Sequence, residues 1–215
     1  YGGVGEEMAQ ASRLASYAGF GPLGRAGRPA DAGQWSRRSG VSSLSAPMPG
    51  RSRFSTIRPM NDLTTAAAEW IAGDPDPVTR AELQGIVDSG DVDELTERMG
   101  ATLQFGTAGL RGRVEAGSNR MNRATVIRAT KGLADYLLAT TGTEHGPIVV
   151  GRDARLSSAT FMDDTIAVLV AAGFKVRYFA DPVPTPLVAY AALHFGGAAA
   201  VVVTASLNPP ADNGY

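Results

Sequence analysis

Ala198-Ala199-Ala200-Val201-Val202-Val203 is a wholly apolar run, and the polar stretch Thr204-Ala-Ser-Leu-Asn-Pro-Pro210 follows it directly. A short valine-rich run after Gly196-Gly197 is typical of a buried strand. Strands of this kind occur in parallel sheets that helices cover on both faces. The stretch therefore indicates an α/β fold, with a polar loop at the carboxyl end of one strand.

The residues before this strand alternate between strand and helix patterns. Strands are expected at residues 101–105, Ile148–Val150 and Lys175–Ala180. Helices are expected at Thr125–Thr140, at Ser157–Ala172 with Ser157 or Ser158 as cap, and at Pro186–Phe195 with Thr185 as cap. This alternation predicts parallel βαβ units with right-handed crossovers. The predicted fold is a three-layer α/β/α sandwich over residues 101–215.

Three further helical patterns lie between Met60 and Gly100. They are Leu63–Ala72 with Asn61 or Asp62 as cap, Val78–Asp88 after Asp76-Pro77, and Val92–Met99. Asp74 and Asp76 lie between helices, where capping is favoured over metal binding. The sequence predicts a helical arm over residues 60–100.

Residues 1–59 differ in composition from the rest. They hold eight Arg, no Lys and three acidic residues, and 24 of the 59 are Gly, Pro or Ser. Because such a segment has little apolar surface to bury, we expect it to be disordered and dispensable. It is either upstream sequence ahead of a start at Met60 or, less in keeping with its pattern, a transit peptide. We also expect that both ends of the sequence are cut.

The composition excludes several classes of function. The 215 residues include 20 Lys+Arg, 21 Asp+Glu, two His and no Cys. A net charge near zero favours neither nucleic acid nor an anionic membrane as partner, and no apolar run is long enough to span a bilayer. Thiolate zinc sites and a Cys nucleophile are excluded. His145 and His194 lie outside any nucleophile elbow, which makes a Ser-His-Asp hydrolase improbable. We expect a cytoplasmic protein.

Candidate chemistry lies in the loops that follow the strands, since ligands of such sheets bind at the carboxyl ends of strands. The loops are residues 106–113, 151–155, 181–186 and 204–210. They contain glycines at 106, 109 and 112, arginines at 111, 113, 152 and 155, and Ser206 at an apparent tight turn. Glycines let backbone N–H groups approach phosphate oxygens, and Arg offers a planar fork of donors. The set indicates a phosphorylated ligand.

Each of these features also has a purely structural interpretation. The three glycines could form a bulged loop, and their G-x-x-G-x-x-G spacing matches neither the dinucleotide fingerprint nor the P-loop. Arg152, Asp153 and Arg155 could be an ion-pair network at a strand end. Ser206, taken alone, is more typical of a turn than of a nucleophile.

Four segments together resemble the first domain of the α-D-phosphohexomutases, the phosphoglucomutase and phosphomannomutase family. They are Phe105–Gly112, Gly151–Arg155, Pro182–Pro186 and Val203–Tyr215. The resemblance runs from about Met60 to Tyr215. The leading helices and residues 105–112 look more like the branch that includes phosphopentomutase-type enzymes.

The resemblance implies a mutase that works through a phosphoserine at Ser206. It implies that Arg111 contacts the phosphoserine region, that Thr204 and Asn208 shape the loop, and that Gly109 belongs to the phosphate-binding part. It also implies Mg²⁺ held through the phosphate of Ser206, and a glucose 1,6-bisphosphate-type activator. The expected substrate is a sugar phosphate, with phosphoryl transfer between O1 and O6 of a hexose or equivalent positions of a pentose.

The sequence departs from the family pattern at two places. Leu207 stands where the family has a His, and leucine can neither donate a hydrogen bond nor carry charge. The chain also stops before the family's metal, sugar and distal-phosphate loops, so we expect the fragment alone to be inactive. The competing hypotheses are a non-catalytic or degenerate relative that binds sugar phosphate, and an unrelated flavodoxin-like phosphate-binding module.

Overall fold

The computed structural model describes residues 60–142 and 146–215. The expectations for residues 1–59 and for His145 concern residues outside these ranges. Within them the chain forms a helical arm and a domain in which helices cover a parallel sheet. The predicted fold class is therefore confirmed. None of the described helices is both long and apolar enough to cross a membrane.

Three helices form the arm: α2 (Met60–Gly73), α3 (Pro77–Ser89) and α4 (Val92–Met99). Asp76 caps α3 by accepting the N–H of Val78 at 2.9 Å, and Asp91 caps α4 by accepting that of Glu94 at 3.0 Å. The capping role predicted for Asp76 is thus confirmed. The cap predicted at Asn61 or Asp62 is wrong, because α2 already begins at Met60.

The arm has its own apolar core, which continues into the α/β domain. The side chains of Leu63, Trp70, Leu83, Leu95 and Met99 are buried together, and Ala116 and Ala124 of the α/β domain complete the cluster. Arg98 binds Glu82 at 2.6 Å within the arm and the carbonyl of Ala116 at 3.2 Å. Apolar packing and a buried arginine therefore hold the arm to the domain.

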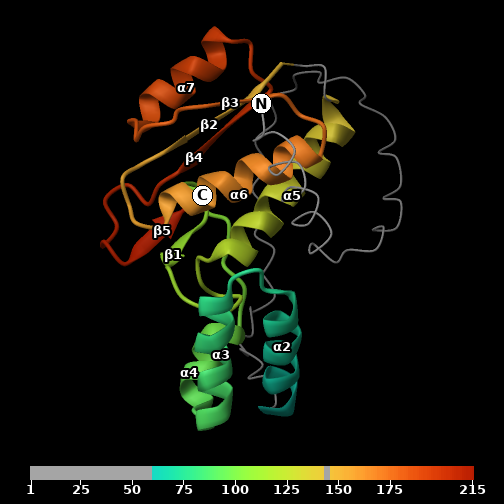
Figure 1. Cartoon of the computed structure of the whole chain (residues 1–215), viewed down its shortest axis with the longest axis vertical. Coiled ribbons are helices and arrows are strands. Elements are labelled where there is room, and N and C mark those ends of the chain that lie inside the picture. Colours follow the sequence, from blue (N-terminus) through green and yellow to red (C-terminus); the bar gives the residue numbers. More distant parts are fainter. Residues whose placement is uncertain (1–59, 143–145) are drawn as a thin grey trace, which may run out of the picture. The chain divides into compact units, whose positions relative to one another are not determined.

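The sheet has the order β3-β2-β4, and all its strands are parallel. The central strand β2 (Ile148–Arg152) pairs with β3 (Val176–Tyr178) and with β4 (Ala199–Val203). Figure 1 shows α7 on one side of this sheet and α5 with α6 on the other. Because the strands run in the same direction, their carboxyl ends lie along one edge. The loops that follow them meet there.

The three helices of this domain are α5 (Arg123–Thr140), α6 (Ser158–Ala171) and α7 (Thr185–His194). Asn122 caps α5 by accepting the N–H of Thr125, so the helix begins two residues before the predicted start. Ser157 lies at the cap position of α6 but makes no capping bond. Thr185 was expected to cap α7 but is its first residue, because Pro184 occupies the cap position.

A second, two-stranded ribbon lies beside the parallel sheet. Antiparallel strands β1 (Arg111–Arg113) and β5 (Asp212–Gly214) form it. The predicted strand at residues 101–105 is wrong: this segment finds no strand to pair with, and the N–H of Leu103 bonds to the carbonyl of Ser118 instead. Gly106 and Gly109 exchange two backbone bonds and reverse the chain into β1.

Gly109 is required by its backbone conformation and by its neighbour. Its φ is +80°, and a Cβ there would collide with the carbonyl oxygen of Tyr215. Leu110 and Tyr215 exchange two backbone hydrogen bonds of 2.9 Å at the same point. Glycine thus permits the close approach from which the ribbon starts.

A buried ion pair joins the two helices on one face of the sheet. The guanidinium of Arg123 in α5 forms two bonds, 2.7 and 2.8 Å long, with the carboxylate of Asp164 in α6. The side chain of Asp164 is 2% exposed. Burial raises the pKa of Asp164, although Arg123 opposes the rise. The carboxylate therefore depends on Arg123 to remain charged inside the protein.

Replacing Arg123 by Ala should destabilise the fold by about 3–5 kcal/mol, because it leaves Asp164 buried without its partner. Lys131→Ala provides the matched control: Lys131 pairs with Asp135 on the same helix, but both side chains are exposed. Its loss should cost less than about 0.5 kcal/mol. Urea denaturation of the chain measures both values. Equal losses for the two variants would contradict the assigned importance of the buried pair.

Gly109→Ala should destabilise the fold by more than about 1 kcal/mol, since alanine disfavours positive φ and its Cβ meets backbone. Gly85→Ala, in the exposed middle of α3 where a Cβ meets nothing within 4 Å, should instead stabilise by about 0.5–1 kcal/mol. Thermal unfolding followed by circular dichroism compares them. A Gly109→Ala chain as stable as the parent would rule out the close approach.

Candidate active site

The loop after β4 holds Ser206 in an uncommon conformation. Its φ of +54° is the sole positive value of a non-glycine residue among the described residues. A left-handed serine costs about 1–2 kcal/mol, and such strain persists where surrounding bonds enforce it. The Oγ1 of Thr204 accepts the N–H of Ser206 at 3.0 Å. Ser206 is exposed, so its hydroxyl is presented to solvent by a fixed backbone.

Arg111 reaches the same loop from the ribbon. Its Nη1 lies 3.3 Å from the Oδ1 of Asn208, and the Nδ2 of Asn208 donates to Asp212 at 2.9 Å. The Nε of Arg111 is buried and has no hydrogen-bond partner among the described residues. The Nη1 contact with Asn208 places the guanidinium of Arg111 next to the loop.

The predicted site residues fall into two groups. Ser206, Thr204, Asn208 and Arg111 are brought together at the edge where β4 ends. Gly109 lies at the entry to the ribbon, against Tyr215, where the described contacts give it a backbone role. Leu207 follows Ser206 with its side chain 98% exposed.

The loop after β2 contributes a carboxylate and an arginine. Asp153 accepts the Nε of Arg155 at 3.1 Å and the hydroxyl of Ser158 at 2.6 Å. The predicted ion-pair network is thus confirmed for Asp153 and Arg155. Arg152 does not join it: its terminal nitrogens donate to the backbone carbonyls of Asp153 and Ala180.

Asp153 has a pKa below its ordinary value. Burial raises the pKa, but hydrogen bonds from Ser158, the Arg155 backbone and Thr204, together with the Arg155 charge, outweigh it. The ionised form therefore stabilises the fold above the ordinary aspartate pKa. This contribution is lost as pH falls through the lowered value.

One contact at this edge could not be predicted from the sequence, except that its asparagine belongs to the family motif. The amide of Asn213 in β5 is fully buried and donates to the hydroxyls of Ser157 and Ser158 at 2.7 and 2.9 Å. These hydroxyls stand at the start of α6. Asn213 thus ties the ribbon to the helix that follows Asp153, a role that only the folded chain reveals.

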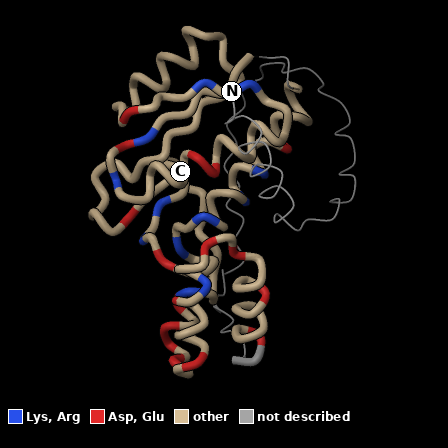
Figure 2. The backbone as a smooth tube through the Cα atoms, in the orientation of Figure 1, with Lys and Arg blue, Asp and Glu red and all other residues tan. Residues whose placement is uncertain are grey.

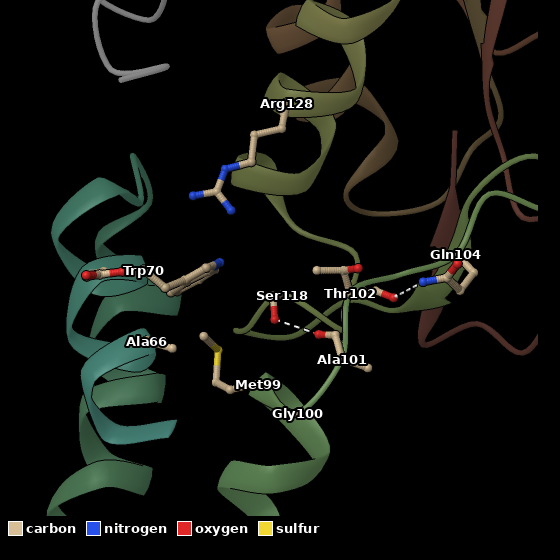
Figure 3. Close-up of a pocket in the computed structure, with 10 residues that line it drawn as sticks. Ala66, Trp70, Met99, Gly100, Ala101, Thr102, Gln104, Ser118 and Arg128 are labelled. Atoms are coloured by element: carbon tan, nitrogen blue, oxygen red, sulfur yellow. Dashed lines mark hydrogen bonds between the residues drawn. The ribbon is translucent and has the colours of Figure 1, made fainter. Parts of the chain in front are cut away.

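The cavity drawn in Figure 3 lies elsewhere. Its volume is about 520 Å³, and Trp70, Met99, Thr102, Ser118 and Arg128 are among the residues that line it. No lining residue comes from the four loops after the strands. We place the candidate active site at the Ser206 loop, because strain, fixed donors and charge converge there and not at the cavity.

Charge is divided between the two parts of the described chain. Residues 60–100 hold ten acidic residues and two arginines, whereas residues 101–215 hold ten Lys+Arg and eight Asp+Glu. Figure 2 shows the acidic positions along the arm helices. The excess of acidic residues in the described part of the chain thus lies in the arm. The domain that carries the Ser206 loop has a small positive balance, which suits an anionic ligand.

The described residues contain no group of three or more Asp, Glu or His that could hold a metal ion. His194 stacks on Tyr190 and meets the edge of the Phe195 ring, at the end of α7.

The family model for phosphoglucomutase/phosphomannomutase, alpha/beta/alpha domain I, matches residues 102–215. The chain is 44% identical over 149 residues to a "probable phosphoribomutase" of Schizosaccharomyces pombe, which covers 68% of this chain and 25% of the relative. It is 39% identical to a phosphoribomutase of Saccharomyces cerevisiae, over 72% of this chain and 25% of the relative. A glucose 1,6-bisphosphate synthase of Mus musculus is 37% identical, over 71% and 26% respectively.

The chain thus spans about a quarter of the length of these curated relatives. The matched residues include β1, the whole parallel sheet and the Ser206 loop. The family model covers more than half of the 215 residues, and the chain therefore belongs to the phosphoglucomutase/phosphomannomutase family, of which it carries the α/β/α domain I.

Proposed function

We propose that this chain carries the phosphoserine centre of a phosphosugar mutase, with Ser206 as the phosphoryl carrier. The observation that carries the proposal is the exposed Ser206, held at φ +54° with its N–H bound by Thr204. A carrier must present its oxygen to a substrate in a repeatable direction, since misplacement slows transfer steeply. A fixed backbone and an exposed hydroxyl meet that requirement.

The reaction is a pair of balanced phosphoryl transfers. The P–O bond to Ser206 breaks as a bond forms to a free hydroxyl of the sugar phosphate, and the proton of that hydroxyl ends on the released Ser206 oxygen. The resulting bisphosphate then gives its other phosphoryl group to the Ser206 oxygen, which regenerates the phosphoserine. The net change is isomerisation of a sugar phosphate.

Arg111 is proposed to stabilise the charge that moves during transfer. Its contact with Asn208 puts a cation beside the loop. Arginine offers several fixed donors to phosphate oxygens, and preorganised donors of this kind are a large part of catalysis. Thr204 and Asn208 act on the loop itself.

We propose a pentose phosphate as the substrate, because relatives at 44% and 39% identity are named as phosphoribomutases. Transfer between O1 and O6 of a hexose phosphate is the alternative. A glucose 1,6-bisphosphate-type activator is proposed as the source of the first phosphoryl group. Mg²⁺ could gain one oxygen ligand from phosphorylated Ser206, and the described carboxylates supply no cage for it.

A non-catalytic relative that binds sugar phosphate is the second candidate function. Leu207 favours it, because an apolar side chain 98% exposed stands beside Ser206 where the resemblance implies histidine. Such a protein would bind sugar phosphate at Arg111 without transferring the group.

Ser206 should become phosphorylated when the protein, as its source produces it, is incubated with glucose 1,6-bisphosphate and Mg²⁺. Peptide mapping locates the phosphate, and coupled assays compare ribose 1-phosphate with glucose 1-phosphate. Ser206→Ala should lose at least about 10³-fold in kcat, since the carrier oxygen is gone. Ser89→Ala, at the exposed end of α3, is the control and should keep full activity. Phosphate at another residue, or an active Ser206→Ala variant, refutes the assignment.

Leu207→His should raise kcat by roughly 10–1,000-fold, because removal of one donor at a developing oxyanion typically costs about 10²–10³ in kcat. Leu207→Ala is the matched control: it shortens the apolar side chain without adding a donor and should leave kcat near the parent value. Steady-state assays of the three proteins measure the effect. No gain with histidine would show that the site works without a donor at this position.

A further inference from the structure

We propose that Arg155, oriented by Asp153, is a positioning residue that clamps the Ser206 loop in its strained conformation. The effect on catalysis rests on the proposed function, whereas the clamp concerns only the conformation of the loop. Asp153 and Arg155 follow the neighbouring strand β2 and touch no proposed substrate.

Arg155 donates to four backbone carbonyls of one loop. Its Nη1 bonds to the carbonyls of Pro209 at 2.6 Å and Asp212 at 2.8 Å. Its Nη2 bonds to those of Asn208 at 2.7 Å and Ser206 at 3.3 Å. With the Nε–Asp153 bond, all five N–H donors of the guanidinium are used. The side chain is only 15% exposed, so it lies inside the loop and holds the carbonyl groups together, and it is not a surface charge.

The loop needs hydrogen bonds from Arg155 because its own backbone supplies few of them. Pro209 and Pro210 lack N–H groups. Within the loop, Asn208 donates to Ala205 and Asp212 donates to Pro209, each at 3.0 Å. The carbonyl of Ser206 points at Arg155 while its N–H points at Thr204. Both sides of the strained residue are therefore held.

Asp153 orients the arginine. Its carboxylate accepts the Nε and the backbone N–H of Arg155 and the hydroxyl of Ser158. Arg155 is thus held from the start of α6, while the Oγ1 of Thr204 accepts the N–H of Ser206 from the end of β4.

Lysine cannot replace this arginine, although it carries the same charge. An ammonium group has three donors at a single point, whereas the clamp needs a planar fork that reaches carbonyls on several residues. Arg155→Lys should therefore keep the ion pair with Asp153 and lose most of the carbonyl contacts. A merely electrostatic role would survive the change.

The test measures the loop and the chemistry separately. Hydrogen exchange of backbone amides in residues 204–212 should become at least about tenfold faster in Arg155→Lys, because charge-assisted bonds to the loop are lost. Transfer from glucose 1,6-bisphosphate to Ser206 should slow by about 100-fold, with little change in KM. Arg177→Lys, an exposed arginine above the Phe195 ring, is the control and should change neither value.

Asp153→Asn supplies a second variant should Arg155→Lys fail to fold. It should give similar losses, and the double variant should be no worse than either single one, since both act on the same loop. Unchanged exchange in both variants overturns the clamp. Faster exchange with unchanged transfer overturns its catalytic role. An unsubstituted protein that takes up no phosphate overturns the proposed function, while the exchange measurement still decides on the clamp.

Discussion

The Asp153 carboxylate stands at the end of the central strand, and three parts of the chain meet there. Ser158 begins α6, Val203 ends β4, and Arg155 donates to carbonyls of the Ser206 loop. Parallel pairing of β2 with β4 brings these parts within hydrogen-bond reach, because it aligns Arg152 with Val203 at the strand ends. The N–H of Asp153 continues the alignment by donating to Val203. The shape of the Ser206 loop thus depends on strand register through a single, partly buried carboxylate.

Much of the fold follows from local sequence signals. Asp76 and Asp91 cap helices where the chain leaves a turn, and the apolar runs at 148–150 and 198–203 lie in the buried strands. The ribbon could not be predicted in this way. Arg111–Arg113 and Asp212–Gly214 have little strand propensity of their own, and each becomes a strand only by pairing with the other across about a hundred residues. Residues 101–105 show the opposite case: their local pattern predicted a strand, but no other strand of the described chain lies beside them to pair with.

The candidate site divides in a similar way. Ser206, Thr204, Asn208 and Arg111 were identifiable because a family motif names them, and the structure brings these four together. Arg155 was visible as a charged residue near Asp153, but its bonds to backbone carbonyls leave no trace in the identity of the residues it contacts. Any loop whose backbone followed the same path would accept the same hydrogen bonds from Arg155, whatever its side chains. Contacts of this kind to backbone carbonyls therefore cannot be predicted from the sequence.

The contact between Arg111 and Asn208 joins positions 97 residues apart. Closing so long a loop is entropically unfavourable until other contacts compensate, whereas the arm helices and each βα unit consist of local contacts. We therefore expect the ribbon to form after the local contacts of the helices. During synthesis Arg111 emerges early, yet its partners Asn208 and β5 are made about a hundred residues later. Until those residues have been made, the contacts that join the ribbon to the Ser206 loop cannot form.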